Sequence, residues 1–292
     1  MKGYLFLDID GTLVDSARTH EISKETMDAL RKAKKNGYGC FICSGRNYGG
    51  LAQYTDIGMD GFVYADGAGI RIEGYEPVLT PIDEDLLKEL EHLVIEELHG
   101  DMSMASDDHF YASEGQYALW TEYMKQMGNA SFFERLYRME DRGDTPILEI
   151  DLDLPDRETE EIFIRKMNPR LEYISTTASY GRGSRTAGEI TMAGVTKGEG
   201  IRRAVAMLGG DMKDTYGFGD SMNDASMLKA CAVGVCMGNG ADELKQIADY
   251  VTDDINENGL ANAFRKFGII WKDPDCMHGR KKLKKVQLIS WH

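Results

Sequence analysis

Apolar runs and amphipathic stretches alternate along the first third of the chain. Residues 4–9 form an apolar run that ends in carboxylates, which is typical of a central parallel strand with reactive groups at its carboxyl end. Residues 23–36 place Met27, Leu30 and Ala33 at helical spacing. The apolar runs 38–43 and 61–65 then end in polar turns. This order of elements predicts a doubly wound, Rossmann-like parallel sheet.

The pattern changes after residue 79. Helical periodicity over 83–98 and 114–127 is followed by strand-like runs at 147–150 and 171–175. This segment therefore has an α+β repertoire of its own.

The first pattern resumes after residue 187. Helices are expected at 197–208, 222–230 and 259–267, and strands at 215–219 and 232–237. We therefore predict an α/β protein whose core consists of residues 1–79 and 188–267, with residues 80–187 as an inserted α+β cap domain.

The composition, 42% hydrophobic and 28% charged, is that of an ordinary soluble globular protein. No apolar run is long enough to span a membrane. Asp8 and Asp10 follow the first residue too closely for a signal peptide. We therefore expect a cytoplasmic protein with no membrane partner, either a monomer or a homodimer.

The charge is strongly negative, with a formal net value of −15. Residues 268–292 form a basic tail with six Lys or Arg and two Asp, so residues 1–267 carry −19. Such a body repels phosphate backbones, and nucleic acid is not an expected partner. The basic run at 280–285 fits either a patch for an anionic surface or a solvated terminus, and we expect the latter.

Five cysteines do not make a disulfide framework in a chain of 292 residues. Cys40 and Cys43 form a C-x-x-C pair, which is also found in redox and metal sites. On the strand predicted at 38–43, however, these two side chains point to opposite faces. We therefore interpret both as buried core residues.

Polar residues follow the first two predicted strands. Asp8 and Asp10 come first; one carboxylate at such a place can attack phosphorus, while a second protonates the leaving oxygen and later takes a proton from water. A solvated acidic turn has the same composition. Ser44, Gly45 and Arg46 follow the second strand, where a hydroxyl, backbone amides and a guanidinium can hold a phosphoryl group. A small polar turn describes that motif equally well.

Two further motifs lie in the last third of the chain. Thr196 and Glu199 form a capping box that places Lys197 in the first turn of a helix, where the helix dipole and the charge both favour an anion. Asp220 ends a predicted strand among small residues, and Mg²⁺ prefers oxygen ligands of this kind. Asp224 is explained by capping of the next helix.

Taken in order, the sequences D-x-D-G-T, S-G-R, G-V-T-K-G and G-D-S-M-N-D resemble the haloacid dehalogenase superfamily over residues 1–267. The large insertion resembles the Cof-type, or IIB, branch. The resemblance implies a Mg²⁺-dependent phosphatase for a small phosphorylated metabolite, with sugar phosphates as the first choice. It implies catalytic roles for Asp8 as nucleophile, Asp10 as general acid and base, and Lys197 as the cation that offsets phosphoryl charge. The phosphate-binding and substrate-binding residues that it implies are Gly11, Ser44, Gly45, Arg46 and Asp66. The metal ligands and their supports that it implies are Asp8, Asp10, Asp220, Asn223 and Asp224.

One position departs from the family pattern. The family often has Asn-Gly-Ala after the third strand, where this chain has Asp66, Gly67 and Ala68. An extra carboxylate facing the pocket would disfavour an anionic group or recruit a cation.

Two alternatives share the expected fold. A phosphomutase also forms an aspartyl phosphate but returns the phosphoryl group to a sugar, whereas a catalytically idle ligand sensor need not keep both acids. The complete set of Asp8, Asp10, Lys197 and Asp220 favours an enzyme. Substrate choice is expected to lie in the loops 107–111 and 180–185 of the cap, although arginines in such loops seldom bind a second anionic group.

Overall fold

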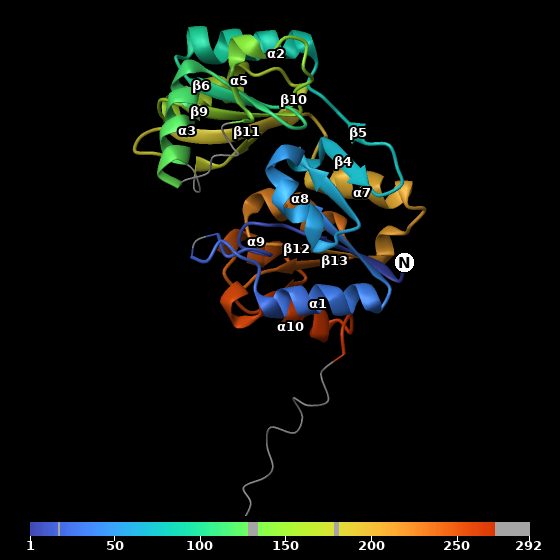
Figure 1. Cartoon of the computed structure of the whole chain (residues 1–292). Helices are drawn as coiled ribbons and strands as arrows, with labels where there is room; N and C mark the ends of the chain where they lie inside the picture. Colours follow the sequence, from blue (N-terminus) through green and yellow to red (C-terminus); the bar gives the residue numbers. More distant parts are fainter. Residues whose placement is uncertain (17, 128–133, 178–180, 272–292) are drawn as a thin grey trace, which may run out of the picture.

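The computed structural model describes residues 1–16, 18–127, 134–177 and 181–271 (Figure 1). Its strands form two sheets. The large sheet has eight strands in the order β14-β13-β12-β1-β2-β3-β4-β5, and the small sheet has six in the order β10-β11-β9-β6-β7-β8. The fold is α/β with a doubly wound parallel core, as the sequence predicts.

The large sheet is parallel from β14 to β3, and β4 and β5 add antiparallel strands at one edge. Its strands are β1 (Gly3–Leu7), β2 (Tyr38–Cys43), β3 (Gly61–Tyr64), β4 (Gly69–Ile72), β5 (Val78–Leu79), β12 (Thr215–Gly219), β13 (Val233–Cys236) and β14 (Tyr250–Val251).

Helices cover both faces of the large sheet. α1 (Lys24–Lys35) and α10 (Gly259–Lys266) lie side by side on one face (Figure 1). The other face carries α7 (Lys197–Met207), α8 (Ala225–Ala230) and α9 (Asp242–Ile247). Leu5 and Leu7 of β1 pack in the cluster of the first face, and Tyr4 and Phe6 in that of the second. Burial on both sides explains why β1 is continuously apolar.

The small sheet is antiparallel except for the pair β7 and β8. Helices α2 (Glu84–Glu91) and α5 (Arg157–Lys166) cover the face turned away from the large sheet (Figure 1), and α3 (Glu114–Met127) packs against β6, β7 and β8. The strands are β6 (Asp101–Ala105), β7 (Phe110–Ala112), β8 (Leu136–Arg138), β9 (Glu149–Leu154), β10 (Leu171–Ser175) and β11 (Thr186–Met192).

Side chains alternate strictly along β9. Ile150 and Leu152 pack with α2 and α5 in the apolar cluster of the small sheet. Glu149 and Asp151 therefore point to the opposite face, because successive side chains of a strand lie on opposite sides. An acidic row thus lies on the face of the small sheet that these helices leave uncovered.

Most elements of the core lie within a few residues of the sequence-based expectation. The helix expected at 83–98 is α-helical only to Glu91 and continues as a π-helix over His92–Glu97. Helix α5 was missed because its sequence is dominated by charged residues. The strands β5, β7, β8 and β14, at two or three residues each, are too short for a periodic signal.

The predicted division into core, cap and tail stays a prediction. β11 runs to Met192 within the small sheet, beyond the boundary expected after residue 187. Ile269 and Ile270, assigned to the tail, are buried in the core cluster beside α10. Residues 272–292 and Tyr180 lie outside the described residues. Among the described helices, none has the length and apolar character needed to cross a membrane.

Cys40 and Cys43 lie on opposite faces of β2, as the spacing predicts. Each belongs to a different apolar cluster, and both are free and buried. Burial, with Asp60 nearby, raises the pKa of the Cys40 thiol to about 12, and burial also raises the pKa of Cys43. These thiols are therefore core residues with little thiolate at neutral pH.

In a Cys276→Ser variant, which leaves only the four described thiols, Ellman's reagent should react slowly with native protein. The thiolate is the reactive form, and burial disfavours it. The absorbance trace should rise quickly only after addition of denaturant. A fast phase in native protein would contradict the buried, unreactive assignment.

Candidate active site

The carboxyl ends of four neighbouring strands bring the predicted site residues to one edge of the large sheet. Asp220, Asp8, Ser44 and Asp66 follow β12, β1, β2 and β3, which lie in this order. The backbone pairing of β1 with β12 continues past the end of β1, because the Asp8 amide donates to the Phe218 carbonyl at 3.0 Å. Open parallel sheets bind ligands at this edge.

Lys197 is the buried cation of the site. Its Nζ donates to Asp8 Oδ1 at 3.0 Å and to Asp224 Oδ1 at 2.6 Å, and its side chain is 0% exposed. Burial lowers the pKa of Lys197, but Asp224 and Asp8 more than offset this, and the net pKa is raised well above its usual value. Thr196 Oγ1 accepts from the Glu199 amide at 3.3 Å, so the predicted cap starts the helix that carries the lysine.

Asp224 has two structural tasks. One oxygen accepts from Lys197, and Oδ2 accepts from the amides of Asp220 and Ser221 at 2.9 and 3.2 Å. Asp224 therefore caps the helix start, as predicted, and also fixes the lysine. Both of its oxygens are in use.

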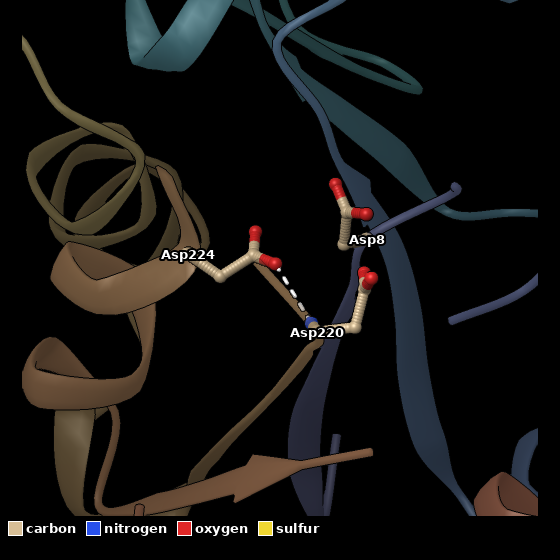
Figure 2. A group of neighbouring side chains, drawn as sticks. All are labelled: Asp8, Asp220 and Asp224. Carbon is tan, nitrogen blue, oxygen red and sulfur yellow. Dashed lines mark hydrogen bonds between the residues drawn. The ribbon is translucent and has the colours of Figure 1, made fainter. Parts of the chain in front are cut away.

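Asp8 and Asp220 point into a common space beside Asp224 (Figure 2), and one oxygen from each of the three lies within 4.8 Å of the others. Burial, followed by the charge of Asp224, raises the pKa of Asp220 to about 7. Burial also raises the pKa of Asp8 well above its usual value, and Lys197 opposes this. Oxygen ligands alone suit a hard divalent cation. Among the described residues, the side chain of Asp224 accepts three hydrogen bonds, whereas that of Asp8 accepts one from Lys197 and that of Asp220 one from Thr12, so Asp8 and Asp220 have more lone pairs left for a metal.

Gly11 lets the first loop approach this pair. Its φ is +86°, and a Cβ at this position would lie 2.3 Å from Asp220 Oδ2. Any other residue would therefore displace the Asp220 carboxylate and strain the backbone. Thr12 Oγ1 donates to Asp220 Oδ1 at 3.4 Å from the same loop.

Asp10 is bound by Arg46 rather than directed at the other carboxylates. The Arg46 guanidinium donates to both oxygens of Asp10, at 2.9 and 2.8 Å, and Ser16 Oγ donates to Asp10 Oδ1. The side chains of Asp10 and Arg46 are 40% and 37% exposed. Of the two roles predicted for Asp10, this orientation suits proton transfer at the open side of the site. A bound metal would therefore take the backbone carbonyl of Asp10 as a ligand and not its side chain.

Ser44, Gly45 and Asn223 lie together near Asp66. Ser44 is buried, and its Oγ accepts from the Arg46 amide at 3.2 Å. A Cβ on Gly45 would lie 3.2 Å from Asp66 Oδ1 and 3.8 Å from Asn223 Nδ2. The Asn223 Oδ1 atom accepts from Ser221 at 2.7 Å.

The loop at residues 106–109 of the small sheet binds directly to the segment that follows β2. The buried Asn47 donates from Nδ2 to the carbonyls of Ser106 and His109 at 3.1 and 3.2 Å. Tyr64 donates to Asp107 at 2.5 Å, and Arg71 forms an ion pair with Asp107. Loop 107–111 was predicted to take part in substrate choice, but the contact of this loop with Asn47 was not predicted, because a single polar residue after a strand does not indicate its partner.

The two arginines of loop 180–185 are engaged within the small sheet. Arg182 and Arg185 both pair with Asp153, and Arg185 also approaches Asp101 at 3.2 Å. They are therefore not free to receive a second anionic group of a substrate.

Residues 5–264 match the family described as haloacid dehalogenase-like hydrolase. The Bacillus subtilis protein YkrA is 28% identical over 274 residues, covering 91% of this chain and 98% of that protein. The B. subtilis protein named 5-amino-6-(5-phospho-D-ribitylamino)uracil phosphatase YcsE is 26% identical, covering 89% and 93%. The solved structure described as the HAD subclass IIB sugar phosphatase BT4131 is 27% identical with a TM-score of 0.74, covering 92% and 100%.

Lys197→Met should lower the free energy of unfolding by about 3–5 kcal/mol, because it leaves Asp8 and Asp224 buried without their cation. The measurement is urea unfolding at pH 7.5 with chelator present. Lys213→Met is the matched control, since Lys213 pairs with Asp211 in solvent, and it should cost less than about 1 kcal/mol. Equal losses in the two variants would contradict the structural role of Lys197.

In chelator, Asp220→Asn should be more stable than the wild type above pH 7. The native state holds this carboxyl at a pKa of about 7, against an ordinary 3.8, so it binds more protons than the unfolded state between these values. The free energy of unfolding of the wild type therefore falls as the pH rises from 3.8 to about 7, whereas Asp220→Asn has no carboxyl at this position and does not show this fall. At ~1.4 kcal/mol per pKa unit, the free energy of unfolding of Asp220→Asn should exceed that of the wild type by at most about 4 kcal/mol. Urea unfolding of both proteins at pH 4 and 8 measures it, and a pH-independent difference would contradict the assignment.

Proposed function

The chain belongs to the haloacid dehalogenase-like hydrolase family, and we propose that it is a magnesium-dependent phosphatase that hydrolyses a small phosphorylated metabolite through an aspartyl phosphate on Asp8. The family match and the related structures confirm the family, the fold and the enzyme class that the motifs predict. The metal, the substrate and the covalent intermediate belong to the proposal.

The contact that carries the proposal joins Lys197 to Asp8. A buried ammonium 3.0 Å from Asp8 Oδ1 favours the ionised carboxylate, which is the nucleophilic form, although burial alone disfavours it. Asp8 stands at the carboxyl end of a central strand, where a phosphate ester can approach. A structural ion pair alone would not require Asp220 beside it.

Asp8 and Asp220 would hold Mg²⁺, which when bound offsets the charge of the attacking carboxylate and of the phosphoryl oxygens. An oxygen of Asp8 then forms a bond to phosphorus while the bond from phosphorus to the leaving oxygen breaks. Ser44 and the neighbouring backbone amides hold the phosphoryl oxygens, and Lys197 adds a fixed positive charge.

Asp10 serves both halves of the reaction. In the first half it gives a proton to the leaving oxygen, and in the second it takes one from the water that releases phosphate from Asp8. Arg46 holds the Asp10 carboxylate through two hydrogen bonds and so fixes its orientation before substrate arrives. Arg46 thus acts on the substrate through Asp10 as well as through its own charge.

Two relatives support a polyhydroxylated leaving group. One is named a sugar phosphatase, and the other is named for a phosphorylated ribitylamino compound. Both names describe a phosphate ester of a compound that bears several hydroxyl groups. We therefore place sugar phosphates first among the candidate substrates.

Asp8→Asn should lower kcat for an aryl phosphate by about three orders of magnitude or more, because an amide cannot attack phosphorus. Phosphate release with Mg²⁺ and with excess chelator measures the effect, and the chelated wild type should be equally inactive. Asp211→Asn, which alters an exposed ion pair far along the chain, should keep full activity. Retained turnover in Asp8→Asn would exclude the covalent route.

Asp10→Asn should accumulate phosphorylated protein when it is given an aryl phosphate. An aryl oxide leaves without an acid, but the water that releases the phosphate still needs a base. Intact-protein mass spectrometry after an acid quench should find one added phosphoryl group in Asp10→Asn and none in Asp8→Asn. Phosphorylated wild type that turns over only with a sugar bisphosphate would instead identify a phosphomutase.

A further inference from the structure

A second group of carboxylates lies where the two sheets meet. Asp66 comes from the turn Ala65–Gly67 after β3 of the large sheet, whereas Glu149 and Glu189 come from β9 and β11 of the small sheet. One oxygen from each of the three lies within 4.8 Å of the others. This acidic triad shares no residue with the group formed by Asp8, Asp220 and Asp224.

Two members of the triad, Asp66 and Glu149, are buried, and Glu189 is partly buried. Asp66 is 3% exposed and Glu149 is 4% exposed. Both oxygens of Asp66, and one each of Glu149 and Glu189, are buried without a hydrogen-bond donor within the described part of the chain, apart from the proton that Asp66 and Glu189 share when one of them is protonated. Buried polar atoms are nearly always satisfied, so these four oxygens need an explanation.

No basic side chain among the described residues forms an ion pair with the triad. Lys197 is the basic group whose charge reaches it, but its Nζ is already bound by Asp8 and Asp224. Asp151 adds a further carboxyl close by, held by Ser103 Oγ at 3.1 Å. Several buried carboxylates without a cation would be strongly destabilising.

Neutralisation can come from protons or from a bound cation. Burial, with Asp66 next, raises the pKa of Glu189 to about 10, and burial raises that of Asp66 as well. A cation would bind all three groups in their ionised form. Three carboxylates supply up to six oxygens, which suits Ca²⁺ with its six to eight ligands better than Mg²⁺, which keeps several waters.

We propose that Asp66, Glu149 and Glu189 form a second divalent-cation site, of the Ca²⁺ type, which ties the small sheet to the large sheet. A carboxylate at position 66 was expected either to disfavour an anionic group or to recruit a cation, and the proposed site corresponds to the second of these alternatives. Its ligands come from both sheets, so binding would favour the arrangement in which the small sheet closes over the active-site edge. The proposal does not depend on the phosphatase chemistry.

The test uses the full chain in an Asp220→Asn background, which removes the metal position beside Asp8. Chelated protein is titrated with Ca²⁺ alone, and binding is followed by calorimetry and by the metal content after desalting. Asp220→Asn should bind one Ca²⁺, and Ca²⁺ should raise its thermal midpoint. Adding Glu149→Gln should weaken binding by at least about 100-fold, since a direct ligand matters at least as much as an outer-shell partner.

Two further variants separate a ligand role from a structural one. Glu160→Gln is the matched control, because Glu160 is also a buried carboxylate but accepts from Tyr173 and Ser175, and it should leave Ca²⁺ binding unchanged. Asp66→Asn removes one carboxylate of the triad and should weaken binding as Glu149→Gln does.

Three results would overturn the proposal. These are no Ca²⁺ bound to Asp220→Asn, equal Ca²⁺ affinity of Asp220→Asn with and without Glu149→Gln, or triad variants of the wild type that lose activity only on amine-bearing phosphate esters without any change in metal content. Ca²⁺ bound by Asp220→Asn, together with a wild type that releases no phosphate in the presence of Mg²⁺, would refute the proposed function and leave the cation site standing.

Discussion

The buried ammonium of Lys197 is the interaction on which the active-site edge depends. Lys197 binds Asp8, which follows β1, and Asp224, which directly precedes α8. It therefore joins the end of β1 to the start of α8. Helix α7 must come close to α8 for this, and a Cβ on Gly198 would lie 2.4 Å from the Ser226 carbonyl. A glycine in the first turn weakens the helix slightly, but it permits the approach that places the cation between two carboxylates.

The carboxylates of the active-site edge each lie in a different electrostatic environment. Asp224 is saturated by the lysine and two amides, Asp10 is held at the open side by a guanidinium, and Asp8 is buried with one contact to the lysine. Asp220 has a backbone neighbour, Gly11, that leaves its carboxylate room. In this strongly acidic protein, the cations Lys197 and Arg46 are thereby held at the edge of the sheet where the proposed phosphate ester would lie.

The sequence predicts the core more fully than the small sheet. β1 and β2 are buried on both faces, so their apolar runs are unbroken, and α1 has a clear helical stripe. β9 instead alternates acids with apolar residues, and the strand expected at 147–150 overlaps only the start of β9, Glu149 and Ile150. The positions of Asp8, Ser44 and Asp220 follow from strand ends that lie side by side.

The pairings of the site were not predictable in the same way. The contact of Arg46 with Asp10, the bridge from Asn47 to the loop at 106–109, and the meeting of Asp66 with Glu149 depend on how separate loops and two sheets are positioned. No local pattern encodes such distances. The unusual residue at position 66 was the one available signal, because a carboxylate in place of an amide changes the charge that its neighbours must balance.

The place of β1 in the large sheet has a consequence for how the chain acquires its structure during synthesis. β1 pairs with β2 on one side and with β12 on the other, with Tyr4 opposite Thr215, so its second partner emerges from the ribosome only after the whole small sheet. Contacts so distant in sequence carry a large loop-closure cost and slow folding. The small sheet, whose strands all lie between Asp101 and Met192, can pair internally before β12 exists. Until then the β12-facing edge of β1 is an unpaired, apolar strand edge, and the nascent enzyme is at its most prone to aggregation in that interval.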